Sequence, residues 1–492
     1  MIKRYIICIK LYFLFERKEK MNKLKLFIEN FLVYGLGGII SKIIPLIMVP
    51  IVTRLMPSTD YFGLSDLSNT VISFASAFAV MGMYDAMYRM FFEKEDEEYK
   101  KNICSTAFTF TIFTSVIIFL LLIIFKKQIA QYFFSDTKYA YIVYLSAIAT
   151  LVGATNSIIS APTRMQNKRK IFLVTNTVSP ILSYAISIPM LLTGYYTIAL
   201  PLAAVISGAT MELAFWIMNK EWFNLRRFDI NLLKQLLVIA IPLFPNFLIY
   251  WVFNSCDKVM ITNMIGIGAA GIYSVGSKLG HASQLIYTAF AGGWQYFAFS
   301  TMKEDNQVKS NSMIFEYLGI ISFVVTAFIC ALSYPIFKML FTEQYLSGYI
   351  VAPYLFLAPL LQMLFQIACN QFIVVKKTWP NMFILSVGAI ANIAINFFLI
   401  PVLGIEGASL ATLMGYAISD VICVIVLCKM KLMVVEKKFI FATLGMVVFF
   451  VIWRIQIPSN VVLGLGLALL FCLYCILLYK NDVNKLMKMV RK

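Results

Sequence analysis

Apolar and polar positions occur in long alternating blocks along this chain of 492 residues. Apolar runs of roughly 20 residues, the length an α-helix needs to cross a bilayer, are separated by short charged segments. We predict 14 such helices, at residues 28–55, 66–91, 103–125, 138–160, 171–192, 195–219, 235–262, 270–298, 313–341, 348–373, 379–400, 405–428, 438–455 and 460–479. No polar segment is long enough for a soluble domain, so the pattern predicts an all-α integral membrane protein.

The basic residues of the connecting segments predict an orientation. Of the 42 Lys and Arg residues, 32 fall at the two termini and in the loops of one side, and five fall within spans. The loops of the other side hold only Lys126, Lys127, Lys138, Lys338 and Arg454. Because Lys and Arg accumulate in cytoplasmic loops, both termini are expected in the cytoplasm, and the net charge of +18 needs no nucleic acid to explain it.

Composition agrees with this class: 61% of residues are hydrophobic, mean hydropathy is +0.82, and only 13% are charged.

Cys472 and Cys475 form a C-x-x-C pair with no second pair or histidine nearby, which favours a role as small apolar packing residues over a metal or redox site. The segment 1–20 lacks the cleavage site of a signal peptide. We expect either that translation begins at Met21 or that this segment forms a short interfacial helix.

An internal repeat organises the spans. At an offset of 208, the segment 55–67 aligns with 263–275, so that Gly63 falls on Gly271. The same offset places the Lys168-Arg169 loop on Lys376-Lys377. Helices 1–6 and 7–12 are therefore expected to be two copies of one unit. Because six is even, the copies insert in parallel, an arrangement typical of alternating-access transporters; a duplicated scaffold without transport is the alternative.

These features define the expected domain organisation. It comprises a cytoplasmic segment (1–27), a first lobe (28–228), a second lobe (229–430), two further helices (431–480) and a cytoplasmic tail (481–492).

Ionisable residues inside the spans are candidate binding residues, because each costs about 2.5–3.5 kcal/mol or more at mid-bilayer. A wet cleft lined by cations would attract phosphate or diphosphate. The candidates are Lys42, Arg54, Arg89, Lys278 and His281. The alternatives are snorkelling to the headgroups, for Arg54 and Arg89 above all, and ion pairs with Asp66, Asp85, Glu212, Asp257 or Asp420.

Polar side chains within spans are candidates for contacts with a sugar. We select Gln284, Gln362, Gln366, Asn370 and Asn392, of which three step by four along one helix. Hydrogen bonding between helices would explain any one of them equally well.

Pro45 and Pro50 in the first helix, and Pro242 and Pro245 in the seventh, predict kinks at equivalent places of the two repeats, where gates could move. No nucleotide-binding loop or zinc pattern occurs, so neither a cofactor nor a metal is expected.

The segment "YGLGGIISKIIPLIMVPIVTRLMPSTDYFGLSDL" (34–67) resembles the opening of Wzx-type polysaccharide flippases. These belong to the multidrug/oligosaccharidyl-lipid/polysaccharide (MOP) exporter superfamily. The shared features are a glycine-rich first helix, Arg54 followed by Pro57, and the pair Phe62-Gly63. The segment 265–279 resembles the equivalent start of the eighth helix, and the resemblance extends over about residues 21–480.

The resemblance implies a V-shaped molecule of two six-helix lobes, like MATE transporters and lipid II flippases, plus two C-terminal helices. It implies flipping of undecaprenyl-diphosphate-linked oligosaccharide across the bacterial inner membrane, for O-antigen of lipopolysaccharide, capsule or exopolysaccharide. The implied partners are this lipid-linked substrate, membrane lipids, a polysaccharide polymerase and a chain-length regulator. No enzymatic activity is expected.

Two other functions stay open from the sequence. A cation-coupled multidrug antiporter of the same superfamily would need acidic groups in its lobes, for which Asp66 and Asp85 are candidates, and typically has 12 spans. A membrane enzyme such as a sugar polymerase would need a large extracytoplasmic loop, which the pattern does not contain.

Overall fold

The computed structural model describes residues 40–288, 290, 294, 298, 306–377, 379–456 and 460–482. Every regular element in this part of the chain is helical. The first described helix covers residues 40–55. The longer helices that follow are α2 (Thr59–Val80), α3 (Met83–Phe91), α4 (Glu97–Ile124), α5 (Lys126–Phe134), α6 (Ala140–Met165), α7 (Arg169–Leu192), α8 (Ala199–Asn219), α9 (Ile230–Trp251), α10 (Asp257–Met264), α11 (Ile267–Gly280), α13 (Gln307–Leu340), α14 (Val351–Val374), α15 (Trp379–Leu403), α16 (Ile405–Lys429), α17 (Lys437–Gln456) and α18 (Val461–Leu478).

The helices confirm the expected fold class of a multi-span membrane protein. Within the described residues, 11 helices are long and apolar enough to cross a membrane, or 12 if α2 and α3, which meet at a bend of 47°, form one span. The other two spans expected from the sequence, 28–55 and 270–298, extend into residues outside those described.

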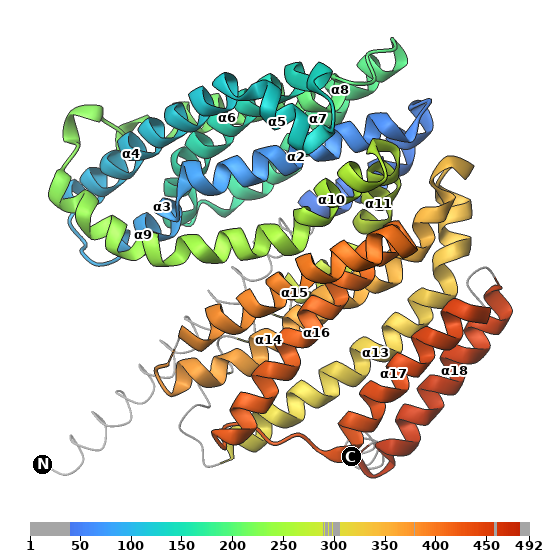
Figure 1. Ribbon diagram of the computed structural model, residues 1–492. Helices are drawn as coiled ribbons and strands as arrows, with labels where there is room; N and C mark the ends of the chain where they lie inside the picture. The colour runs from blue at the N-terminus through green and yellow to red at the C-terminus, as the bar shows by residue number, and fades with distance from the viewer. Residues whose placement is uncertain are drawn as a thin grey trace, which may run out of the picture.

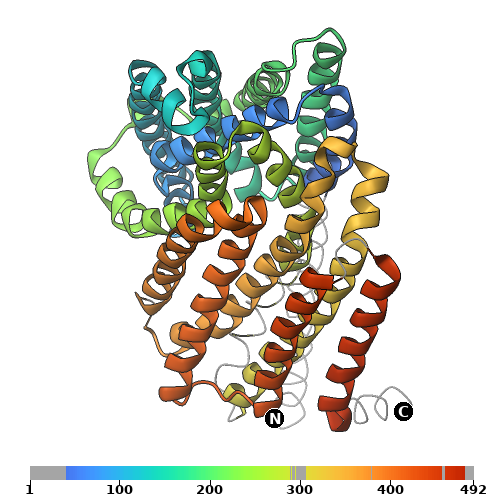
Figure 2. The ribbon, with the colours of Figure 1, turned by 45° about the vertical axis from the view of Figure 1, so that its right-hand side comes forward.

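The helices form two bodies. Helices α2–α9 make one body and α13–α18 the other, and α10 and α11 lie between them (Figure 1). Although α9 begins the second repeat in the sequence, its first half packs on the first body, where Leu233, Leu236 and Ala240 join a core with Met83 and Met87. Helices α17 and α18 lie along the outer side of the second body, beside α13 (Figure 2).

The repeat is visible in the backbone. The turn after α6 and the turn after α14 each contain a left-handed residue, Asn167 at φ 56° and Lys376 at φ 59°. The turns before α8 and α16 each contain a glycine with positive φ, Gly194 at 89° and Gly404 at 61°. Helices α6, α7 and α8 of the first body therefore correspond to α14, α15 and α16 of the second.

The two copies touch through equivalent glycines. A Cβ atom on Gly63 of α2 would collide with the carbonyl oxygen of Ile267, and one on Gly271 of α11 would collide with the carbonyl oxygen of Thr59. Because hydrogen replaces a side chain at both positions, the two helix backbones come into direct contact near their first turns. This crossing joins the two repeats.

Helix α9 continues as an α-helix through Pro242 and Pro245. The irregular part of this span comes later, as a π-helical turn (Val252–Cys256) that leads directly into α10. From this turn, the Asn254 side-chain amide donates to the Tyr250 carbonyl near the end of α9 at 2.7 Å. Turns of this kind insert one extra residue and occur often at functional sites.

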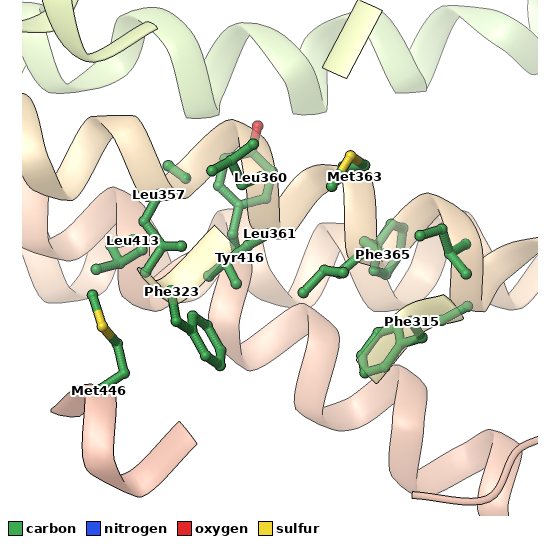
Figure 3. Close-up of a cluster of buried hydrophobic side chains, with 14 of the residues drawn as sticks. Phe315, Phe323, Leu357, Leu360, Leu361, Met363, Phe365, Leu413, Tyr416 and Met446 are labelled. Atoms are coloured by element: carbon green, nitrogen blue, oxygen red, sulfur yellow. The ribbon is translucent and has the colours of Figure 1, made fainter. Parts of the chain in front are cut away.

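Helix α14 is the centre of the second body. Twenty of its 24 residues are buried, which is the pattern of a helix surrounded by other helices. Leu357, Leu361 and Phe365 of α14 pack with Phe323 of α13 and Tyr416 of α16 in one apolar core (Figure 3). The only residues of α14 that escape full burial before its last two positions are Gln362 and Gln366.

Replacing Gly271 with alanine tests the backbone contact between the repeats. The added methyl group forces α2 and α11 apart, and overpacking of this kind costs about 1–3 kcal/mol. We expect Gly271→Ala to melt at a lower temperature than the wild-type protein in detergent. Gly153→Ala is the matched control, because nothing lies within 4 Å of a Cβ atom there. Equal melting of the two variants would contradict the contact.

Candidate functional site

A cavity of about 440 Å³ lies where the first helix, α2, α10 and α11 meet. Its wall contains three lysines, Lys42, Lys258 and Lys278, and one carboxylate, Asp66. Polar side chains complete the lining: Ser41, Asn69, Thr70, Ser73, Asn254, Ser255, Ser274, Ser277, His281 and Gln284. We call this space the cationic cavity. Ammonium groups and hydroxyl donors around one space can hold an anion such as a phosphate.

Asp66 is the centre of the charge network. Its carboxylate, almost fully buried, pairs with the Lys258 ammonium at 2.5 Å and with the Lys278 ammonium at 3.2 Å, and accepts a hydrogen bond from Ser274 at 2.8 Å. Lys278 thus forms the ion pair that the sequence left open as an alternative. One carboxylate cannot neutralise two ammonium groups, so the cluster keeps a net positive charge. The Lys278 side chain is still 40% exposed and can reach a ligand.

Lys42 adds a third cation to the cavity. Its ammonium lies 3.5 Å from Gln284 Oε1 and 3.4 Å from Thr288 Oγ1, both weak contacts. Among the described residues it forms no ion pair with an acidic side chain. Its charge is therefore available to an anion in the cavity.

The other candidate residues lie in varied places. His281 lines the cationic cavity, with Nδ1 at 2.9 Å from both the carbonyl and the hydroxyl oxygen of Ser277. The Arg54 guanidinium donates to the Met339 carbonyl of α13 at 3.0 Å, and Arg89 is exposed in the last turn of α3; neither lines the cationic cavity. Pro45 of the first helix lines the cavity next to Leu46.

The amide side chains predicted to contact a sugar fall into two groups. Gln284 is in the cationic cavity, whereas Gln362, Gln366 and Asn370 follow one another on α14. The Gln366 Oε1 and Asn370 Nδ2 atoms are buried and have no hydrogen-bond partner within the described part of the chain. These atoms have capacity for further hydrogen bonds.

Asn392 belongs to a separate buried cluster around Asp257. The Asp257 carboxylate accepts hydrogen bonds from Tyr273 at 2.6 Å, from Asn396 at 2.7 Å and from Thr412. The Asn392 side-chain amide in turn donates to the Thr412 hydroxyl at 3.1 Å. No lysine or arginine pairs with Asp257 in the described residues, so the sequence alternative of an ion pair is not seen at this position. A lone carboxylate among amide and hydroxyl oxygens is chemically suited to a proton or a hard monovalent cation.

No described residues form a group of three or more His, Cys, Asp or Glu side chains that could hold a metal ion. The Asp257 cluster contains only one such group, with neutral oxygens around it. It therefore differs from the multi-carboxylate sites of divalent metals.

A second, larger cavity of about 720 Å³ lies inside the first body, between α6, α7 and α8. We call it the N-lobe cavity. Its lining is rich in hydroxyl and amide groups and includes Arg164. A third space of about 190 Å³ shares Ser183 and Ala204 with this cavity and Asp66, Asn69 and Lys278 with the cationic cavity. The three spaces are therefore neighbours that share wall residues.

Comparison with known proteins gives the class. The lipid II flippase MurJ in an inward closed conformation matches with a TM-score of 0.68 at 15% identity, covering 92% of this chain and 100% of that chain. An inward-facing MATE family transporter of the MOP superfamily matches with 0.58 at 14% identity, over 80% and 94%. A MATE transporter in a straight conformation matches with 0.57 at 13%, over 82% and 95%. The chain has the fold of the MOP superfamily of flippases and transporters.

Residues 51–349 match the family model described as polysaccharide biosynthesis protein. The protein belongs to this family, which confirms the resemblance found in the sequence. No curated protein matches the chain.

Removing the Asp66 carboxylate tests the charge network. Asp66→Asn leaves two neighbouring ammonium groups without a counter-charge, and breaking a buried ion pair in this way costs about 3–5 kcal/mol. We expect a clear fall in the melting temperature in detergent. The double variant Asp66→Asn with Lys258→Met should recover part of the loss, because one of the two uncompensated charges is gone. A single variant as stable as the wild type would refute the network.

Proposed function

We propose that this protein flips a lipid-linked oligosaccharide, carried on undecaprenyl diphosphate, between the leaflets of a bacterial cytoplasmic membrane. The product would serve the assembly of a surface polysaccharide such as O-antigen, capsule or exopolysaccharide. The observation that carries the proposal is the cationic cavity, with three lysines and one carboxylate at the junction of the repeats. The family match supports the connection with polysaccharide biosynthesis.

In this proposal the diphosphate binds beside Lys42, Lys258 and Lys278. Lys278 and Lys258 can share their hydrogen bonds between Asp66 and a phosphate oxygen, and Lys42 can exchange its weak contacts with Gln284 and Thr288 for the ligand. Hydrogen bonds between charged partners are about twice as strong as neutral ones. The prenyl tail stays in the lipid while the head group crosses through the polar interior.

Alternation of access is proposed to arise from a change in the angle between the two bodies. The backbone contact of Gly63 with Gly271 supports this, since it joins α2 of the first body to α11, which lies between the two bodies. With both termini in the cytoplasm, as the loop charges predict, this contact lies at the extracytoplasmic end. A polymerase and a chain-length regulator are the proposed partners after release.

The charge of Lys42 can be tested in cells that lack the gene. We expect Lys42→Gln to reduce surface polysaccharide roughly tenfold at normal expression, because a hydrogen bond to a charged group contributes about 1.5–3 kcal/mol. Lys42→Arg keeps the charge and should retain most export. Lys138→Gln is the control, since Lys138 pairs with Asp136 at the exposed start of the span Thr137–Met165 and does not line the cationic cavity. Unchanged export by Lys42→Gln would exclude Lys42 from the site.

A second candidate function is cation-coupled drug antiport, and the Asp257 cluster is the observation that favours it. A buried carboxylate without a basic partner can exchange a cation during a transport cycle. The cationic cavity argues against a cationic drug as cargo, because three lysines would repel it.

Transport of a cationic dye separates the two functions. Purified protein in liposomes with an imposed sodium or proton gradient is expected to leave ethidium untransported. Dye movement that the gradient drives and Asp257→Asn abolishes would instead establish the antiporter.

A further inference from the structure

The N-lobe cavity has a chemical character different from that of the cationic cavity. Hydroxyl groups of α6 and α7 line it, and several donate to carbonyls of their own helix: Ser157 to Ala154 at 2.7 Å, Ser160 to Ser157 at 3.3 Å and Thr175 to Ile171 at 2.9 Å. A hydroxyl whose proton is used in this way still has oxygen lone pairs to offer. The wall therefore presents mainly acceptors.

Asn156 strengthens this excess of acceptors. The residue lines the same cavity, and its Oδ1 atom is buried and has no hydrogen-bond partner in the part of the chain that the structure describes. A buried polar atom without a partner costs free energy unless a ligand or water satisfies it. A ligand with many hydroxyl donors matches this wall.

Aromatic rings complete the lining at the end where α6 finishes. Tyr84, Phe172 and Phe215 line the cavity, and the Arg164 guanidinium links two of them. It donates to the Tyr84 hydroxyl at 3.1 Å and lies 5.1 Å from the centre of the Phe172 ring. Hydroxyl acceptors beside flat apolar rings suit a sugar, which has hydroxyl donors at its edges and C–H groups on its faces.

Hydrogen bonds between helices hold the cavity wall in place. Ser207 of α8 donates to the Ser179 carbonyl of α7 at 2.8 Å. Asn219 of α8 donates to the Ile159 carbonyl at 2.9 Å and to Thr163 at 2.8 Å, both on α6. Because the three helices are tied together, the cavity exists before a ligand arrives, which lowers the entropic cost of binding.

The described helices at the equivalent place of the second repeat differ in their side chains. The corresponding helices α14 and α16 pack through apolar side chains such as Leu360, Leu364 and Leu413. The hydroxyl-rich lining is thus a feature of the first repeat, since α14 contains no serine or threonine.

We propose that the N-lobe cavity is the glycan subsite of the transporter, and that its acceptor-rich wall selects sugars with free hydroxyl groups. This inference rests on the proposed function, with the diphosphate in the cationic cavity. The space of about 190 Å³ shares Asn69 with the cationic cavity and Ser183 with the N-lobe cavity, and in this proposal one ligand extends across it. Ser41 of the first helix borders both cavities as well, next to Lys42.

The test compares two lipids on the full-length protein in detergent, with native mass spectrometry as the readout. One is undecaprenyl diphosphate without sugar, and the other is the lipid-linked saccharide extracted from cells that lack the gene. Ser160→Leu fills the N-lobe cavity. We expect it to weaken binding of the saccharide lipid by about tenfold and to leave binding of the sugar-free lipid within about twofold.

Controls separate the inference from the proposed function. Asn176→Leu is a second cavity-filling variant, used if Ser160→Leu does not fold, and Thr210→Leu makes a similar change at an exposed position of α8. Lys258→Met should weaken binding of both lipids. Unchanged binding of the saccharide lipid by the folded cavity variants overturns the glycan subsite alone. A wild-type protein that binds neither lipid overturns both proposals.

Discussion

The ion pairs of Asp66 with Lys258 and Lys278 are the constraint on which the centre of this protein depends. Charges at this depth are tolerated only when they are paired or face water, and here they do both. The carboxylate comes from the first repeat and both ammonium groups from the second. The network therefore joins the repeats and at the same time leaves a positive charge beside the polar interior. The same ion-paired residues therefore stabilise the contact between the repeats and attract an anionic ligand.

Duplication followed by divergence explains the arrangement around this network. Gly63 and Gly271 are equivalent positions and lie face to face, and Asp66 and Ser274, also 208 residues apart, share a hydrogen bond of 2.8 Å. A pseudo-twofold relation between α2 and α11 accounts for both contacts. The chemistry at equivalent positions has nonetheless diverged, since a carboxylate faces a hydroxyl. The same divergence left hydroxyl-rich helices α6 and α7 in one body and a mostly apolar core around α14 in the other.

The sequence predicted the helices, the repeat and the fold class, because hydrophobic blocks of membrane length and loop charges are local features. It also selected Lys42, Lys278 and His281, which the structure brings together in the wall of the cationic cavity. It did not show which way each helix faces. Lys258 is therefore not among the predicted binding residues, although it lines the cationic cavity and pairs with Asp66. Asn392 resembled a cavity residue, although its amide joins the buried cluster around Asp257.

The N-lobe cavity was invisible in the sequence for a related reason. Its serines and threonines are the residues that transmembrane helices also use for close packing, so each looked structural by itself. The signal that could have revealed it is the concentration of such residues on α6 and α7 compared with α14 and α15, and the unusual Arg164 at the end of α6.

The π-helical turn at Val252–Cys256 has a geometric consequence for the span that contains it. Each residue advances a helix by about 100°, so one inserted residue rotates everything after it by more than a quarter of a circle. Before the turn, Trp251 donates to the Thr70 carbonyl of α2 at 3.2 Å; after it, Asp257 faces Asn396 of α15. The inserted residue thus changes the direction in which the later side chains of this span point. As a result, the same span presents polar groups to both halves of the molecule.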